Sequence, residues 1–516
     1  MCYHVCIGMF DALSGREKTA PVREGAAAMR YTNPILYGDY SDPDVIRVGE
    51  DFYMISSSFT YVPGIPVLHS RDLAHWELIG YAARRLPFPQ YDKPAHKRGI
   101  WAPSLRYHNG TFYVYVCMPD EGLFAFTAQD PAGEWECHYV KDVTGWIDPC
   151  PLFDDDGRVW LVHGFAASRA GINNVLYVHK MSADGLTVVD KGRMVYDGAD
   201  HNDITVEGPK AYKREGKYWI LCPAGSVKPG YQLALRADSI YGPYERRVVL
   251  GQGSTPINGP HQGGWVDDGH GKDWFIHFQD MDAYGRVTHL QPVDWSDGWP
   301  VMGKKGAPVL GGQIDLPPFA AEIPTSDDFQ QGLGIQWQWQ ANPNKGWYTE
   351  LKPGLRLHAA PADSLFGAGN FLSQLMQSHD FDMDVRFETH AQDGDISGIG
   401  VMGYTYYYIA LGQGRVSLKM GMATEISRWT PERVTETPIS EIMWPYAEIT
   451  LRMRVRRGNV SFFYGDGNHS LRPLGGEYPM TCGGWTGARP GLFTLNTLGR
   501  WGGWSDVKYV KISKAE

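Results

Sequence analysis

The sequence of 516 residues lacks the marks of several protein classes. No apolar run reaches 18 residues, so we expect no membrane-spanning helix. The seven cysteines are odd in number and form no Cys-x-x-Cys pair, which argues against a disulfide framework and favours reduced thiols in the cytoplasm. The first ten residues have no basic region and make a poor secretion signal. No run of Lys or Arg is present and the formal net charge is −10, so we expect no nucleic-acid and no membrane partner.

Helical periodicity and common catalytic motifs are scarce as well. G-x-S-x-G, H-E-x-x-H and P-loop motifs are absent, and a G-x-G-x-x-G match at 398–403 is followed by the strand-like YTYYYIALG rather than by a helix. Glycine (61 residues), proline (34), tryptophan (18) and tyrosine (29) are abundant. Many turns between short aromatic strands are typical of an all-β protein.

Five stretches repeat one local pattern: a bend at proline, a short strand, a turn and an aromatic-rich strand. They start at residues 42, 101, 148, 207 and 261, so the gaps are 59, 47, 59 and 54 residues. Strand-rich repeats of about 50 residues predict a β-propeller, here with five blades. Because a propeller arranges its blades around one axis, we expect equivalent positions to converge there. The residues at the starting points are Asp42, Trp101, Asp148, Glu207 and His261.

The composition divides the chain into four parts. Residues 1–32 are predicted to be an irregular leader, and residues 33–303 hold the blades. Residues 304–324 are rich in proline and glycine and are predicted to form a surface linker. Residues 325–516 contain strands that alternate between apolar and charged side chains, as in 381–388, which predicts a β-sandwich.

Three of the repeated positions carry a carboxylate: Asp42, Asp148 and Glu207. Glycoside hydrolysis requires a protonated acid beside the leaving oxygen and an ionised base beside the nucleophile, and a third carboxylate can raise the pKa of the acid. A single Asp before Pro is better explained as a turn residue, but the repeated offset favours catalysis. Glu207 is the most informative because a turn does not require Glu there. Asp44, two residues after Asp42, is a rival for the base.

Four further residues have both a functional and a structural interpretation. Arg286 fits an ion pair with a central carboxylate or a solvated surface position. His261 fits a metal ligand near the axis or a hydrogen-bonded core histidine, and the sequence alone favours the second. Phe59 and Trp101 fit a sugar-stacking surface, although aromatic residues at strand ends are usually core.

At this point the sequence resembles glycoside hydrolase family 43. The stretch NPILYGDYSDPDVIRVGEDFYMISSSFTYVPGIPVLHSRDLAHWELIG opens the resemblance, and GIWAPSLRYHNGTFYVYV, GWIDPCPLFDDDGRVWLVHG, VEGPKAYKREGKYWIL and AYGRVTHLQPVDW continue it in order. It covers residues 33 to about 303. The remainder resembles, more loosely, the concanavalin-A-like sandwich of the family's xylosidase branch through FLSQLMQSHDFDMDV and GLFTLN. The resemblance implies an all-β fold, with a five-bladed β-propeller followed by that sandwich, and an inverting mechanism.

The resemblance also implies a role for each candidate residue. Asp42 matches the catalytic base, Glu207 the general acid, and Asp148 the carboxylate that orients the acid and raises its pKa. Many relatives read PDPS where this chain reads SDPD, and alignment on the following VIR favours Asp42 over Asp44. The remaining matches are Arg286 beside the carboxylates, Phe59 and Trp101 in the sugar pocket, and His261 as the histidine through which several members, but not all, bind calcium near the axis.

We therefore expect an exo-acting, inverting glycoside hydrolase that needs no cofactor for its chemistry, with a structural calcium left open. The expected substrates are short β-1,4-xylo-oligosaccharides, from which it releases xylose, and also α-L-arabinofuranosides. The alternative is a carbohydrate-binding propeller without catalysis. The sequence leaves open the preference between xylose and arabinose, a homo-oligomeric state and the role of residues 1–30.

Overall fold

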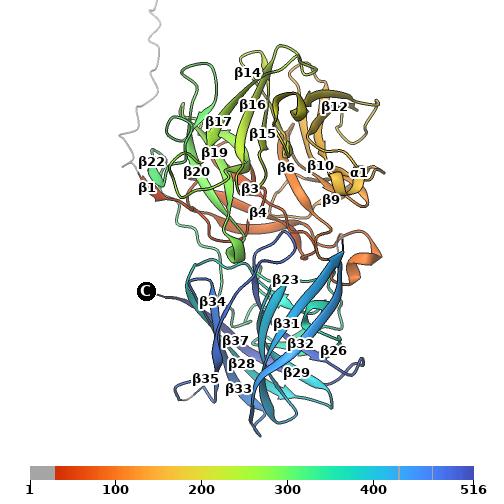
Figure 1. Cartoon of the computed structure of the whole chain (residues 1–516), viewed down its shortest axis with the longest axis vertical. Helices are drawn as coiled ribbons and strands as arrows, with labels where there is room; N and C mark the ends of the chain where they lie inside the picture. Colours follow the sequence, from red (N-terminus) through yellow and green to blue (C-terminus); the bar gives the residue numbers. More distant parts are fainter. Residues whose placement is uncertain (1–28, 428–429, 468, 516) are drawn as a thin grey trace, which may run out of the picture.

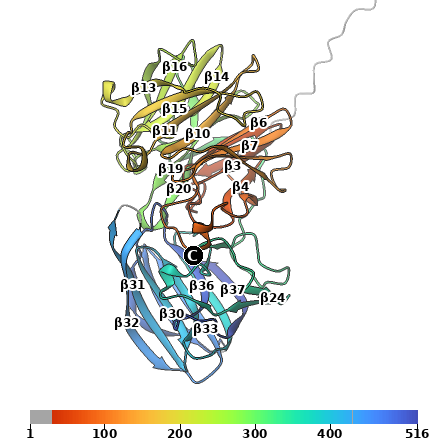
Figure 2. The ribbon, with the colours of Figure 1, turned by 90° about the vertical axis from the view of Figure 1, so that its right-hand side faces the viewer.

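The computed structural model describes residues 29–427, 430–467 and 469–515. The chain forms two all-β lobes, the first in red to green and the second in cyan to blue (Figure 1), and a view turned by 90° separates them in the same way (Figure 2). The only α-helix among the described residues is the single turn α1 (Ala167–Ala170). None of the helices in this part of the chain has the length and apolar character to cross a membrane.

The first lobe is a ring of five antiparallel sheets, each made of four consecutive strands, as the repeats predict. Blade one is β2 (Asp44–Val48), β3 (Asp51–Ile55), β4 (Gly64–Ser70) and β5 (Glu77–Ala83). Blade two is β6 (Trp101–His108), β7 (Thr111–Met118), β8 (Gly122–Ala128) and β9 (Glu136–Lys141). Blade three is β10 (Trp146–Phe153), β11 (Val159–Phe165), β12 (Val175–Met181) and β13 (Arg193–Asp197). Blade four is β14 (Lys210–Arg214), β15 (Lys217–Ala224), β16 (Tyr231–Ala237) and β17 (Glu245–Gly251), and blade five is β18 (His261–Asp267), β19 (Asp273–Asp280), β20 (Arg286–Asp294) and β21 (Val301–Met302).

The first strand of each blade lies nearest the propeller axis. β2 contacts both β6 and β18, and β10 contacts both β6 and β14. Burial follows this order, because all but the last residue of β10 is buried whereas no residue of the outer strand β9 is buried. The residues at the start of each first strand therefore converge at one end of the axis, as the sequence predicts.

The ring is closed by the segment that enters blade one. β1 (Met29–Thr32) pairs with β22 (Gly311–Ile314), so part of the predicted irregular leader and part of the predicted linker form a two-stranded sheet. Asn33 then contacts blade five: its Nδ2 donates to the carbonyl oxygens of Leu290 at 2.9 Å and Val309 at 2.8 Å, and its Oδ1 accepts from the Leu290 amide at 2.8 Å. Residues 1–28 of the predicted leader lie outside the described residues.

The second lobe is the expected β-sandwich of two large sheets. One sheet has the order β23-β27-β36-β29-β30-β31-β32, with β26 beside β36, and the other has β24-β25-β37-β28-β33-β34-β35. The strands of the first sheet are β23 (Gln338–Trp339), β26 (Ala360–Pro361), β27 (Leu372–Ser373), β29 (Asp395–Met402), β30 (Thr405–Gly412), β31 (Arg415–Ser427), β32 (Thr430–Met443) and β36 (Arg489–Asn496). Those of the second are β24 (Tyr348–Glu350), β25 (Leu355–His358), β28 (Phe381–His390), β33 (Glu448–Arg456), β34 (Asn459–Gly465), β35 (Arg472–Pro479) and β37 (Trp504–Lys514).

The alternating pattern of β28 has the predicted consequence for its two faces. Phe381, Met383, Val385 and Phe387 are all buried in the sandwich core. On the outer face the carboxylate of Asp384 accepts two hydrogen bonds from Arg452 of β33, at 2.6 and 2.7 Å. The period of two thus places one side of the strand in the core and the other in a ladder of ion pairs.

We expect Asn33→Ala to destabilise the propeller, because it removes three hydrogen bonds at the ring closure and leaves the buried Leu290 backbone without its side-chain partner. A buried polar group without a partner costs about 1–3 kcal/mol. Thermal unfolding of the variant should begin at a lower temperature than that of the wild type. The control is Asn173→Ala at an exposed loop position, and an equal melting temperature for both variants would contradict this account.

Candidate active site

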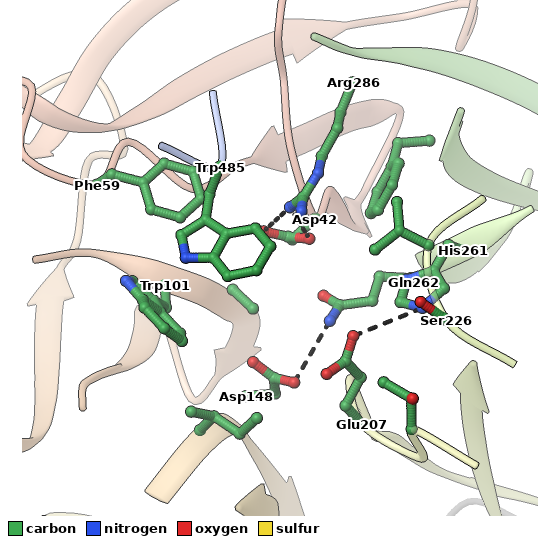
Figure 3. Close-up of a pocket in the computed structure, with 15 residues that line it drawn as sticks. Asp42, Phe59, Trp101, Asp148, Glu207, Ser226, His261, Gln262, Arg286 and Trp485 are labelled. Atoms are coloured by element: carbon green, nitrogen blue, oxygen red, sulfur yellow. Dashed lines mark hydrogen bonds and ion pairs between the residues drawn. The ribbon is translucent and has the colours of Figure 1, made fainter. Parts of the chain in front are cut away.

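A pocket of about 190 Å³ lies at the end of the propeller axis where the blades begin. Residues from every blade line it, together with Trp485 from the sandwich (Figure 3). The seven residues that the family resemblance assigns to the site all line this pocket: Asp42, Phe59, Trp101, Asp148, Glu207, His261 and Arg286. The convergence inferred from the repeats is therefore present in the structure.

Asp42 is held by two donors from different blades. The Arg286 guanidinium donates from Nη1 to Oδ1 at 3.1 Å, and the Ser57 hydroxyl donates to Oδ2 at 2.6 Å. The Ser57 oxygen in turn accepts from the Ala102 amide at 2.7 Å, which fixes the hydroxyl. The Asp42 side chain is only 7% exposed, so a guanidinium and a hydroxyl supply the charge-assisted contacts that water would give an exposed carboxylate.

Asp148 occupies the equivalent place in blade three. Its Oδ2 accepts from the Gly208 amide at 2.7 Å and from Gln262 Nε2 at 3.3 Å. Burial and the nearby charge of Asp42 raise the pKa of Asp148 above its ordinary value. The bond to Gly208 also places this carboxyl directly beside the backbone of Glu207.

Glu207 has the least support of the three carboxyl groups. In the described part of the chain its closest polar partner is His261, whose Nε2 lies 3.5 Å from Oε1. Burial lowers the pKa of His261 to about 3, with the Arg286 charge adding to the effect, so the imidazole is neutral and this contact is not an ion pair at neutral pH. Burial, followed by the charges of Asp148 and Asp42, raises the pKa of Glu207. These conditions favour a protonated Glu207 that can donate a proton.

Several polar atoms at the pocket have no hydrogen-bond partner among the described residues. They are Trp101 Nε1, both ring nitrogens of His261, and Gln262 Oε1. Buried polar atoms normally have hydrogen-bond partners, so we expect these four atoms to bind water or a ligand that carries several hydroxyl groups. The rings beside them form an aromatic wall: Trp101 lies edge-on to Phe59 and to Trp485, each with its ring centroid 6.4 Å away.

Asp44, the rival for the catalytic base, does not line the pocket. Its Oδ2 accepts from the Leu105 amide at 2.8 Å and from Arg106 Nη1 at 2.9 Å, and the Lys210 ammonium lies 3.7 Å away. Asp44 is completely buried and ties blades one, two and four together. Asp42 is therefore the carboxylate of this segment that a substrate can reach.

His261 alone does not make a calcium site. Calcium takes six to eight oxygen ligands, whereas His261 offers nitrogen atoms. In the described part of the chain, the group of three possible ligands lies in the sandwich, at Glu388, His390 and Asp506, where Lys508 and Arg356 already pair with the two carboxylates. Calcium near His261 stays a prediction.

The comparisons with known proteins agree with this geometry. The model for glycosyl hydrolases family 43 matches residues 31–300, and a beta xylosidase C-terminal concanavalin A-like domain matches residues 326–513. The chain belongs to glycosyl hydrolase family 43. It is therefore a glycoside hydrolase, and the non-catalytic alternative is not favoured.

Two relatives and one solved structure illustrate the family match. A protein of Xylanibacter ruminicola, whose name assigns it provisionally to the beta-xylosidases, is 39% identical over 475 residues, covering 90% of this chain and 86% of its own. A Butyrivibrio fibrisolvens protein named xylosidase/arabinosidase is 34% identical over 403 residues, covering 71% and 76%. The structure of a bifunctional GH43-CE protein of Bacteroides eggerthii is 27% identical with a TM-score of 0.83, and the match covers 95% of this chain but 64% of that longer one.

The residues that fix the pocket wall formed by the sandwich are not among those that the sequence of this family 43 chain predicts. Asp39, which is buried, accepts from the Arg286 amide at 2.8 Å through Oδ1 and from the Gly487 amide at 2.8 Å through Oδ2. The Ala488 amide also donates to the Ala283 carbonyl at 2.7 Å. One carboxylate thus positions both the arginine of the pocket and the sandwich loop that carries Trp485.

We expect Glu207→Gln to stabilise the protein more at pH 8 than at pH 5. The raised pKa of Glu207 means that the folded state binds the proton more tightly than the unfolded state, so stability falls as the pH rises above the ordinary value of 4.5. Glutamine removes this loss. Each unit of raised pKa costs about 1.4 kcal/mol once the group ionises, so a gain of a few degrees in melting temperature is expected at pH 8. Glu134→Gln, at an exposed position, is the control, and a gain independent of pH would refute the assignment.

We expect Asp39→Asn to lower kcat although Asp39 does not line the pocket. The amide can accept through one atom only, so either the Arg286 or the Gly487 amide loses its acceptor. A small displacement of a catalytic group can cost up to about 100-fold in rate. Steady-state kinetics, measured well below the melting temperature of the variant, should show this loss in kcat. The exposed Asp238→Asn serves as the control, and full activity of Asp39→Asn would reject the positioning role.

Proposed function

We propose that the protein is an exo-acting, inverting β-D-xylosidase that releases xylose from short β-1,4-xylo-oligosaccharides and also acts on α-L-arabinofuranosides. The observation that carries the proposal is the division of environments among Asp42, Asp148 and Glu207 around one pocket. The names of the Xylanibacter and Butyrivibrio relatives support xylose and arabinose as the sugars released. A volume of about 190 Å³ suits one terminal pentose ring, which supports cleavage from a chain end.

In the proposed reaction Asp42 and Glu207 act on opposite sides of the scissile bond. A water molecule attacks the anomeric carbon while Asp42 accepts one of its protons. The bond from that carbon to the glycosidic oxygen breaks, and the oxygen keeps the electron pair and takes the proton of Glu207. The anomeric configuration inverts in this single displacement. Asp42 ends protonated and Glu207 ends ionised, and exchange with solvent restores both.

Asp148 and Arg286 maintain this division of roles. The pKa of Glu207 is raised in part by the charge of Asp148, so the acid keeps its proton until the leaving oxygen accepts it. Arg286 donates to Asp42 and supplies the positive charge that a buried carboxylate needs before it receives the proton of water. Phe59, Trp101 and Trp485 surround the ring of the sugar.

The leaving group distinguishes the two catalytic roles. Glu207→Ala should reduce hydrolysis of xylobiose by about 100-fold or more, but reduce that of 2,4-dinitrophenyl β-xyloside far less, because a good leaving group needs no proton. Asp42→Asn should slow both substrates equally, since both require an activated water. The first-formed sugar of the wild type, followed by proton NMR, should be α-xylose.

Two results would overturn the proposed function. β-Xylose as the first product would exclude inversion. No turnover of aryl xylosides or aryl arabinofuranosides by the wild type would exclude both proposed substrates. A cytoplasmic location, a homo-oligomeric state and a bound calcium ion stay predictions.

A further inference from the structure

A second cavity, of about 520 Å³, lies between the propeller and the sandwich beside the active-site pocket. The two cavities share Ser226, Val227, Arg286 and Trp485 as lining residues. We call the second cavity the interdomain groove. When the terminal sugar of a substrate occupies the pocket, the leaving portion of that substrate lies outside the pocket. The interdomain groove, which both domains line, is the space next to the pocket.

Lys97 on the propeller side of the groove is held between two aromatic rings. Its ammonium lies 5.4 Å from the ring centroid of Tyr404 and 5.6 Å from that of Trp485, both from the sandwich. Its stem is packed under Gly484, since a Cβ on that glycine would lie 2.5 Å from Lys97 Cγ. The position of this charge is therefore fixed by contacts that contain no anion.

The other cations around the groove are matched with carboxylates. Lys228 pairs with Asp282, and Arg286 with Asp42. Arg98, the residue after Lys97, lies 3.8 Å from the carboxylate of Asp120, which Arg169 also contacts at 3.1 Å. Across the described residues, no carboxylate lies within 4 Å of the Lys97 ammonium. Burial lowers the pKa of Lys97 and so disfavours the charged form of this ammonium.

We propose that the interdomain groove binds a leaving sugar that carries a carboxylate, a uronic acid, and that Lys97 pairs with this group. The proposal rests on the proposed function, because the acidic sugar belongs to the portion of the substrate that hydrolysis releases. A neutral sugar presents hydroxyl groups and has no need of a fixed cation. A carboxylate carries a single charge, as one ammonium does.

The test compares two substrates of matched size, 3-carboxyphenyl and 3-carbamoylphenyl β-D-xyloside. The ratio of their kcat/KM values in the wild type, divided by the same ratio in Lys97→Gln, cancels their different intrinsic reactivities. We expect this quotient to be about 5, the effect of a modest ion pair, and to arise in KM. It should fall toward 1 in 0.5 M salt, which screens the pair. Lys180→Gln, at an exposed position on β12, should leave the ratio unchanged.

Binding of the corresponding thioglycosides, which are not hydrolysed, gives the same comparison without turnover. The inference is wrong, while the proposed function stands, if Lys97→Gln does not selectively lower the affinity for the carboxylated thioglycoside and the quotient is 1. If neither xyloside is hydrolysed, the proposed function fails, and the thioglycosides still decide whether Lys97 selects a carboxylate. Should Lys97→Gln not fold, the salt dependence of the wild-type preference decides, and a preference unaffected by salt rejects the pair.

Discussion

Three carboxyl groups in one buried pocket repel one another, and the surrounding structure offsets that repulsion unequally. Asp42 receives a guanidinium and a hydroxyl, Asp148 receives an amide and a carboxamide, and Glu207 receives only a neutral imidazole at 3.5 Å. This gradient of support separates a carboxylate that can accept a proton from a carboxyl group that can give one. The guanidinium that neutralises Asp42 of blade one belongs to Arg286 of blade five. Their ion pair therefore lies where the ring of blades closes, and this one contact both balances the charge of Asp42 and joins the first blade to the last.

The local pattern of the sequence was sufficient to predict the propeller and the convergence of its five repeat starts at one pocket, whereas Phe59 and Arg286 were assigned to that pocket through the family resemblance. The repeats carry a backbone feature as well as a composition. Every residue that precedes a repeated proline has a positive φ, between 34° and 55°, and this left-handed bend lies just before or within the start of the first strand of each blade. Asp42 and Asp148 stand at that bend, whereas Glu207 and Trp101 stand one residue earlier. The three carboxylates therefore stand at two different positions relative to the repeated proline, and not at one common position. The residues at the bends are Asp42, Ala102, Asp148, Gly208 and Gly259.

The remainder depends on contacts between distant parts of the chain, which no local pattern reveals. The pairing of β1 with β22 gave structure to residues 29–32 and 311–314, where turn-rich composition indicated none. Asp39 and Trp485 were missed for the same reason, since neither stands in a repeat and their roles arise from how the two lobes meet. Asp44 shows the converse: its sequence neighbours resemble those of a catalytic residue, and only its three partners in blades two and four reveal a structural role.

The hydrogen bond between Asp39 and Gly487 spans 448 positions of the chain. Each blade is made of consecutive strands, so the ring can assemble progressively as the ribosome delivers it. The pocket wall that bears Trp485 cannot form until the chain has been synthesised past Gly487. Nascent chains that have not reached this loop therefore carry the three carboxyl groups without the pocket wall that encloses them.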